Sequence, residues 1–130
     1  MVEALTAVLA ADPRIAYALL FGSGVRGTTH LESDVDVAIG VAGPTSFDLI
    51  DLGALAAKLE AAAGRRVDLV LLDEASPGLA YRVFRDGHTI VARDKPALDA
   101  RRARAILEYL DFRPVEQLCA RGVLAAAHGR

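Results

Sequence analysis

Residues 21–38 read FGSGVRGTTHLESDVDVA, and this stretch decides the fold. It begins at the end of one apolar run of strand length, Ile15 to Phe21, and it ends inside a second, Val35 to Val41. The connection between them, Gly22 to Ser33, holds three glycines and two threonines and shows no helical pattern. Because the crossover between parallel strands usually contains a helix, these two strands are predicted to be antiparallel.

The chain that follows predicts a third strand. Thr45 and Ser46 are candidate N-caps for a helix that runs to about Ala63, and Gly64 suits the position after its end. A nearly continuous apolar run at Val67 to Leu72 comes next. Since a helix joins the second and third strands, they are expected to pair in parallel through a right-handed crossover. The sheet should therefore be mixed.

Helices and one short strand complete the predicted domain. A helix is expected at residues 2–11, and a shorter one from Ser76-Pro77 to Gly87. Thr89 to Ala92 suits an edge strand. Two helices are expected in the tail, at about 96–109 and 114–127. The predicted fold class is α+β, a small mixed sheet flanked by helices, with a helical C-terminal tail.

Composition limits the class of protein. A length of 130 residues with 53% hydrophobic side chains suits one compact domain. The net charge of -2 gives no general attraction to nucleic acid or to an anionic membrane, so neither is expected as a partner. We find neither a signal-peptide pattern nor an apolar run near the ~20 residues of a membrane span. The single cysteine, Cys119, favours a reducing, cytoplasmic setting.

Several polar residues converge on one edge of the predicted sheet. Gly22 and Ser23 follow the first strand, Asp34 and Asp36 lie at the start of the second, and Asp68 lies at the start of the third. The second strand runs antiparallel to the first and parallel to the third. These positions are therefore predicted to lie side by side.

The three aspartates form a candidate metal site. Asp34 and Asp36 are two residues apart on a strand, so their side chains share one face. Two such close carboxylates resist joint ionisation, and a divalent cation removes that cost. Asp68 lies in an apolar strand, where an unpaired charge is expensive to bury. Mg²⁺ prefers carboxylate oxygens, water and substrate phosphates, so we expect it here.

The loop between the first two strands is a candidate phosphate site. Its glycines let backbone N–H groups approach a phosphate closely, and the Ser23 hydroxyl can donate a further hydrogen bond. Arg26 can hold a phosphate with two parallel hydrogen bonds. A phosphate loop beside a carboxylate-bound metal is what phosphoryl-type transfer requires, because that chemistry is mostly positioning and charge neutralisation.

One competing interpretation of this loop is rejected. Glycines at positions 22, 24 and 27 also match the dinucleotide-binding fingerprint. That fingerprint needs a helix to start at the loop and to lead into a parallel strand. Residues 28–33 lead directly into the second strand and leave no room for this helix.

The complete pattern resembles a known superfamily. Gly22-Ser23, ten further residues, Asp34-x-Asp36 and a later lone Asp68 on a strand look like the signature of polymerase-β-type nucleotidyltransferases. Residues 21–38 resemble its minimal (MNT) branch, although Val25 stands where that branch usually has Ala. RVDLVLLDEASP at 66–77 and YRVFRDGHTI at 81–90 are similar to MntA-type adenylyltransferase antitoxins. The resemblance covers about residues 15–95 well and the tail loosely.

The resemblance implies a fold, a reaction and a partner. It implies a minimal nucleotidyltransferase domain at 1–95 with the polymerase-β-like fold and a tail at 96–130 packed on it. The reaction would be transfer of AMP from Mg-ATP to a tyrosine hydroxyl of a cognate HEPN-domain ribonuclease toxin, with release of pyrophosphate. The implied roles concern six residues. Asp34 and Asp36 would bind Mg²⁺, Asp68 would help hold a second ion and favour hydroxyl deprotonation, and the phosphates would be cradled by Gly22, Ser23 and Arg26.

Two other functions remain open. The chain could be a nucleotidyltransferase acting on a small molecule or nucleic acid, although 130 residues leave little room for a dedicated acceptor domain. It could instead be an antitoxin that occludes its toxin without catalysis, which would give three converging carboxylates no purpose. The basic tail carries apolar residues that can cover the core or meet another helix. These are Ile106, Leu107, Leu110, Val115, Leu118 and Leu124.

Overall fold

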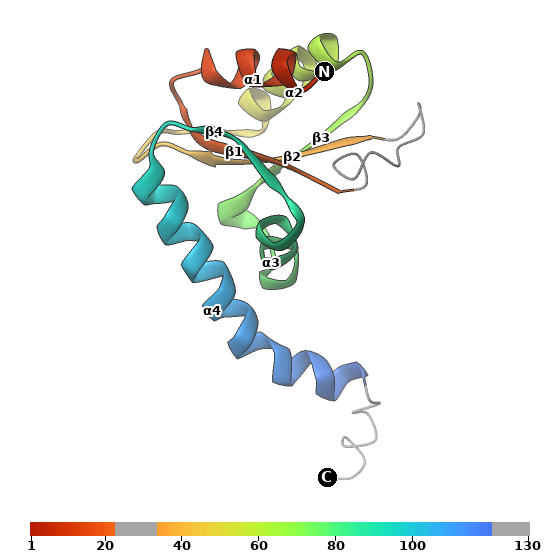
Figure 1. The fold of residues 1–130 in the computed structure, drawn as a ribbon, viewed down its shortest axis with the longest axis vertical. Coiled ribbons are helices and arrows are strands. Elements are labelled where there is room, and N and C mark those ends of the chain that lie inside the picture. The colour runs from red at the N-terminus through yellow and green to blue at the C-terminus, as the bar shows by residue number, and fades with distance from the viewer. Residues whose placement is uncertain (23–33, 121–130) are drawn as a thin grey trace.

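The computed structural model describes the backbone of residues 1–22 and 34–120, with side chains up to residue 111. Figure 1 shows the described elements in space. Their order is α1 (Val2–Ala10), β1 (Ile15–Phe21), β2 (Val35–Val41), α2 (Leu49–Ala63), β3 (Val67–Leu71), the 3-10 turn η2 (Leu72–Glu74), α3 (Pro77–Asp86), β4 (His88–Ala92) and α4 (Lys95–Ala120).

Four strands form one mixed sheet in the order β3-β2-β1-β4. β1 pairs antiparallel with β2 and with β4, whereas β2 and β3 are parallel. The predicted strand directions are therefore confirmed, and so is the fold class. Helices α1 and α2 cover one face of the sheet, and α3 and α4 cover the other (Figure 1). We call these the α1/α2 face and the α3/α4 face.

Each face of the sheet has its own core. The core on the α1/α2 face consists of large aliphatic side chains and one alanine: Leu5, Leu9, Ile15, Ala18, Leu20, Val35, Val37, Ile39, Leu55, Leu59, Val67 and Val91. The core on the α3/α4 face is smaller in its side chains and includes four alanines. Its buried residues are Ala16, Tyr17, Leu19, Ala38, Leu72, Ala80, Val83, Leu98 and Ala105. Alternation along β1 and β2 produces this division, because successive side chains point to opposite faces.

The start of α2 differs from the prediction. Its N-cap is Asp48, whose carboxylate accepts a hydrogen bond of 2.9 Å from the backbone N–H of Asp51, while the Asp51 carboxylate accepts one of 3.0 Å in return. This reciprocal pair satisfies two otherwise orphaned donors. Thr45 donates its own N–H to the carbonyl of Ala42 and so belongs to the preceding turn. The predicted caps Thr45 and Ser46 were wrong, whereas Gly64 ends the helix as expected, with φ +72°.

The tail forms one helix where two were predicted. α4 runs from Lys95 to Ala120 and continues through Pro114. An interior proline removes one backbone hydrogen bond, but its fixed φ is close to the helical value, so a helix can continue past it with a local bend. The predicted break before Pro114 was therefore wrong. Residues 121–127 lie outside the described part of the chain, and the division into a domain at 1–95 and a tail at 96–130 stays a prediction.

Candidate active site

The strand register brings the predicted site residues to one edge of the sheet. Phe21 at the end of β1 is paired with Asp36 on β2, and Asp36 is paired with Asp68 on β3. Gly22 follows Phe21 directly and lies at the same edge. The neighbours of Asp36 on β2, Val35 and Val37, point into the core on the α1/α2 face. Alternation therefore places the carboxylate of Asp36 on the α3/α4 face.

Two hydrogen bonds fix the start of the parallel strand pair. The N–H of Val35 donates to the carbonyl of Arg66 over 2.9 Å, and the N–H of Val67 donates to Oε2 of Glu60 over 3.1 Å. The second bond ties β3 to α2. Because both bonds lie next to the aspartates, they hold Asp36 and Asp68 in register.

Gly22 is required by its closeness to Asp36. Its φ of +87° lies in the left-handed region, which favours glycine. A methyl group at this position would collide with the Asp36 carboxylate. The backbone of the loop therefore begins in direct contact with the carboxylate, as a phosphate loop beside a metal ligand would require.

The three carboxylates have different surroundings. Asp36 is half-buried, and burial raises its pKa, with further contributions from the charges of Asp68 and Asp34. Asp34 forms an ion pair of 3.9 Å with Arg66, whose side chain is 82% exposed, so this pair adds little. Asp68 is exposed, so the expectation that it is a buried charge was wrong. Its pairing with Asp36 remains the reason to place it in the site.

The metal site stays a prediction. Among the described side chains, those of residues 1–22 and 34–111, no three His, Cys, Asp or Glu are grouped closely enough to hold a metal ion. The donor set itself suits Mg²⁺, since Asp34, Asp36 and Asp68 offer only hard carboxylate oxygens. A cation would also relieve the repulsion that raises the pKa of Asp36. Ser23 and Arg26 lie outside the described residues.

A cleft of about 200 Å³ opens beside Asp36, the one of the three candidate ligands that lines it. Its lining residues come from the end of β1, from β2 and from α3: Phe21, Gly22, Asp36, Leu79, Arg82 and Asp86. The start of α3 agrees with the prediction, because the Ser76 hydroxyl accepts a hydrogen bond of 3.2 Å from the N–H of Leu79 and Pro77 is the first helical residue. Sequence reasoning did not identify Arg82. Its spacing from Leu79 and Asp86 places all three on one helical face, but the sequence does not show what that face meets.

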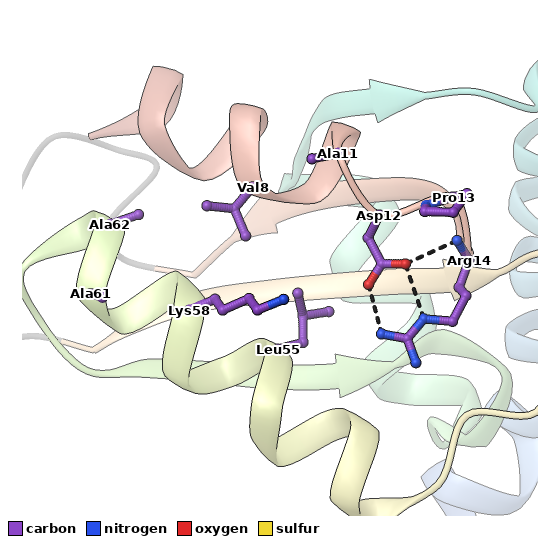
Figure 2. Close-up of a pocket in the computed structure, with 9 residues that line it drawn as sticks. All are labelled: Val8, Ala11, Asp12, Pro13, Arg14, Leu55, Lys58, Ala61 and Ala62. Atoms are coloured by element: carbon purple, nitrogen blue, oxygen red, sulfur yellow. Dashed lines mark hydrogen bonds and ion pairs between the residues drawn. The ribbon is translucent and has the colours of Figure 1, made fainter.

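A larger cavity of about 770 Å³ lies elsewhere, between α1 and α2 (Figure 2). At its rim the Arg14 guanidinium donates to both oxygens of Asp12, over 3.0 and 2.8 Å, and pairs with Asp51 over 3.0 Å. These contacts tie the turn before β1 to the start of α2. None of the three candidate metal ligands lines this cavity. We assign the chemistry to the smaller cleft, which Gly22 and Asp36 line together on the α3/α4 face.

The fold and the arrangement of carboxylates define a class of protein. Residues 3–96 match the family model described as "Polymerase beta, Nucleotidyltransferase". This match covers well over half of the chain, and the chain belongs to this family.

More specific similarities concern toxin–antitoxin systems. The chain is 40% identical over 75 residues to the protein adenylyltransferase MntA of Shewanella oneidensis, over 58% of this chain and 52% of that protein. The aligned stretch thus spans about half the length of this curated relative. A crystal structure of a toxin-antitoxin with AMP-PNP contains a chain that is 28% identical, with a TM-score of 0.81 over 95% of this chain and 98% of that one.

A second solved structure contains a modified toxin. It is a tri-AMPylated Shewanella oneidensis HEPN toxin in complex with an MNT antitoxin, matched at 25% identity with a TM-score of 0.74, over 95% of this chain and 99% of that one.

A separate observation concerns membranes: no helix within residues 1–22 and 34–120 is long and apolar enough to cross one.

Proposed function

We propose that this chain is an adenylyltransferase antitoxin that transfers AMP from ATP to tyrosine hydroxyls of a cognate HEPN-type ribonuclease toxin and so neutralises it. The observation that carries the proposal is the match of nearly the whole chain to a toxin–antitoxin structure with AMP-PNP. The placement of Asp34, Asp36 and Asp68 at one edge of the sheet supports it. We assign the reaction to the cytoplasm, where ATP is available.

In the proposed reaction, the hydroxyl oxygen of the acceptor attacks the α-phosphorus of ATP. A new phosphorus–oxygen bond forms, the bond to the β-phosphate breaks, and pyrophosphate leaves. We assign the hydroxyl proton to the carboxylate of Asp68, which is exposed and accessible to an incoming side chain. Gly22 brings its backbone against the Asp36 carboxylate, which positions the start of the loop for phosphate.

Asp34, Asp36 and Asp68 are the residues that would hold Mg²⁺, for which we propose two ions. When bound, the metal neutralises phosphate charge and aligns the reacting groups. Ser23 and Arg26 are proposed to contact the phosphates. The half-buried position of Asp36 would strengthen its interaction with a cation, because solvent would screen that interaction less than at the surface.

The outer part of α4 is available to a partner. Ile106, Leu107 and Leu110 are 41%, 62% and 46% exposed, whereas Leu98 and Ala105 on the same helix are buried. The stripe was predicted either to cover the core or to meet another helix. Leu98 and Ala105 cover the core instead, so the second use remains for the exposed residues. An exposed apolar stripe on a helix suits docking against another helix. We propose that the toxin contacts this part of α4.

Mass spectrometry of the toxin after incubation with this protein, ATP and Mg²⁺ tests the proposal. One or more additions of AMP, about 329 Da each, are expected on tyrosine, since the transfer leaves AMP on the acceptor. The modified toxin should remain inactive after this protein is removed. Recovery of ribonuclease activity with no added mass would favour occlusion. AMP found on RNA or on a small alcohol would favour a different acceptor.

A further inference from the structure

One face of α3 forms a wall of the catalytic cleft. Leu79, Arg82 and Asp86 line the cleft together with Gly22 and Asp36. Ala80 and Val83 on the same helix are fully buried against the sheet. Because this packing fixes the rotation of the helix, the core determines that Arg82 lines the cleft.

Arg82 is available to bind an anion. Within the described residues, no hydrogen bond or ion pair joins its guanidinium to another side chain. Arg85, one turn further along α3, is engaged: it donates to both oxygens of Asp86 over 3.0 and 2.9 Å and lies over the ring of Tyr81. Both oxygens of Asp86 thus accept hydrogen bonds from Arg85.

The charged residues that line the cleft are Asp36 on β2 and both Arg82 and Asp86 on α3. Asp36 and Arg82 line the same cavity of about 200 Å³, but they form no ion pair with each other. A phosphate in this cavity would lie within reach of the Arg82 guanidinium, and a cation held by Asp36 would neutralise part of its charge. The guanidinium matches phosphate oxygens with two parallel hydrogen bonds.

We propose that Arg82 is a phosphate-binding residue for the nucleoside triphosphate and holds it from the α3 side of the cleft. The inference rests on the proposed function for the identity of the nucleotide. The observations favour phosphate over a group on the toxin, because Arg82 shares its cavity with Asp36 and Gly22. The positive charge of Arg82 neutralises phosphate charge, which the negative carboxylate of Asp36 cannot do. The guanidinium also orients the triphosphate along the cleft.

Calorimetric titration of Mg-AMP-PNP into the isolated protein tests this role without an acceptor. Arg82→Ala should weaken binding about 10-fold to 100-fold, the loss expected for a charge-assisted hydrogen-bonded pair. Arg82→Lys should recover part of the affinity, since it restores the charge but not the planar fork. Arg104→Ala is the matched control, and its affinity should stay within about twofold of the unsubstituted protein, because Arg104 pairs with Asp73 and Glu108, which do not line the cleft.

A structural role is separated from a binding role by thermal unfolding. Without nucleotide, the midpoint of Arg82→Ala should equal that of the unsubstituted protein. With AMP-PNP, its increase in midpoint should be smaller, because a weaker ligand stabilises less.

Four results would overturn the inference. Unchanged affinity in Arg82→Ala would remove the phosphate contact but leave the proposed function in place. An equal loss in Arg104→Ala would indicate an effect of surface charge in general. Normal nucleotide affinity combined with a raised KM for the toxin would assign Arg82 to the partner. Failure of the unsubstituted protein to bind Mg-AMP-PNP would overturn the proposed function and this inference together.

Discussion

The two faces of the sheet are built from different residues. The core on the α1/α2 face is made almost entirely of leucine, isoleucine and valine. The core on the α3/α4 face contains four alanines, a tyrosine and the only buried charged residue among those described, Arg101. Arg101 donates to the carbonyl of Leu72 over 2.9 Å and pairs with Asp73 over 3.5 Å. One face thus excludes polar groups, while the other accommodates them.

Because of this difference, the α1/α2 face mainly stabilises the fold, and the α3/α4 face carries the candidate active site. Large aliphatic side chains bury the most apolar area and contribute most of the free energy of folding. Alanines let α3 and α4 approach the sheet closely, so that α3 forms a wall of the cleft beside Asp36. Substitutions in the core of the α1/α2 face should therefore lower the free energy of unfolding. Substitutions at the cleft on the α3/α4 face should instead lower the rate of AMP transfer.

The largest effect is expected at Asp36. Asp36→Asn should lower AMP transfer by about 10³-fold or more, because a metal ligand is lost. The fold should be intact and, without Mg²⁺, as stable or slightly more stable, since repulsion from Asp34 and Asp68 is relieved. Transfer assays and thermal melts measure both. Asp99→Asn, on the surface of α4, is the control, and equal Mg-ATP affinity in Asp36→Asn and the unsubstituted protein would refute the metal role.

The opposite behaviour is expected at Leu59, which is fully buried on the α1/α2 face. Leu59→Ala should lower the free energy of unfolding by about 2–5 kcal/mol, because it removes buried methyl groups and leaves a cavity. AMP transfer per folded molecule should be unchanged. Denaturant titration measures the loss, and Lys58→Ala on the same helix should stay within about 0.5 kcal/mol. A catalytic defect in folded Leu59→Ala would break the separation between the faces.

An intermediate effect is expected at Asp68. Asp68→Asn should lower turnover by about 10²-fold, the size typical of a lost base or metal ligand, while nucleotide affinity falls much less. Because Asp68 is exposed on β3, the free energy of unfolding should change little. Steady-state kinetics with nucleotide titration separate the two quantities. A near-normal rate would show that Asp68 takes no part in the reaction.

The smallest effect is expected at Asp12, which lies at the rim of the α1/α2 cavity in Figure 2. Hydrogen bonds from Arg14 hold the pKa of Asp12 below its usual value. Its contribution to stability is therefore present above a pH of about 4 and is lost as the pH falls below that value. Asp12→Asn should cost about 0.5–1 kcal/mol at neutral pH, and the difference from the unsubstituted protein should shrink in acid. A difference that stays constant with pH would contradict the assignment.

Much of the candidate site could be predicted because it depends on local pattern and connection length. Asp34 and Asp36 share a face because strand side chains alternate. The short connection at 22–33 forced an antiparallel pair, and the helical crossover to β3 indicated a parallel one. These two facts are enough to bring Gly22, Asp36 and Asp68 to one edge.

Other features could not be predicted because they depend on competition between neighbours. Thr45, Ser46 and Asp48 could all cap α2, and the reciprocal bonds with Asp51 favour Asp48. Pro114 could have ended the tail helix, but α4 continues through it. In both places several local solutions differ by about 1–3 kcal/mol, and the surrounding structure selects one.

The sequence by itself determined the strands, their directions and the convergence of the aspartates, since periodicity and loop length act within short stretches of chain. Only the tertiary structure decided that Asp68 is exposed, because β3 is the edge strand of the sheet. Only the tertiary structure brought Arg82 to the cleft, because the burial of Ala80 and Val83 sets which side of α3 faces Asp36. Such facts depend on how separate elements dock, and no local pattern encodes that.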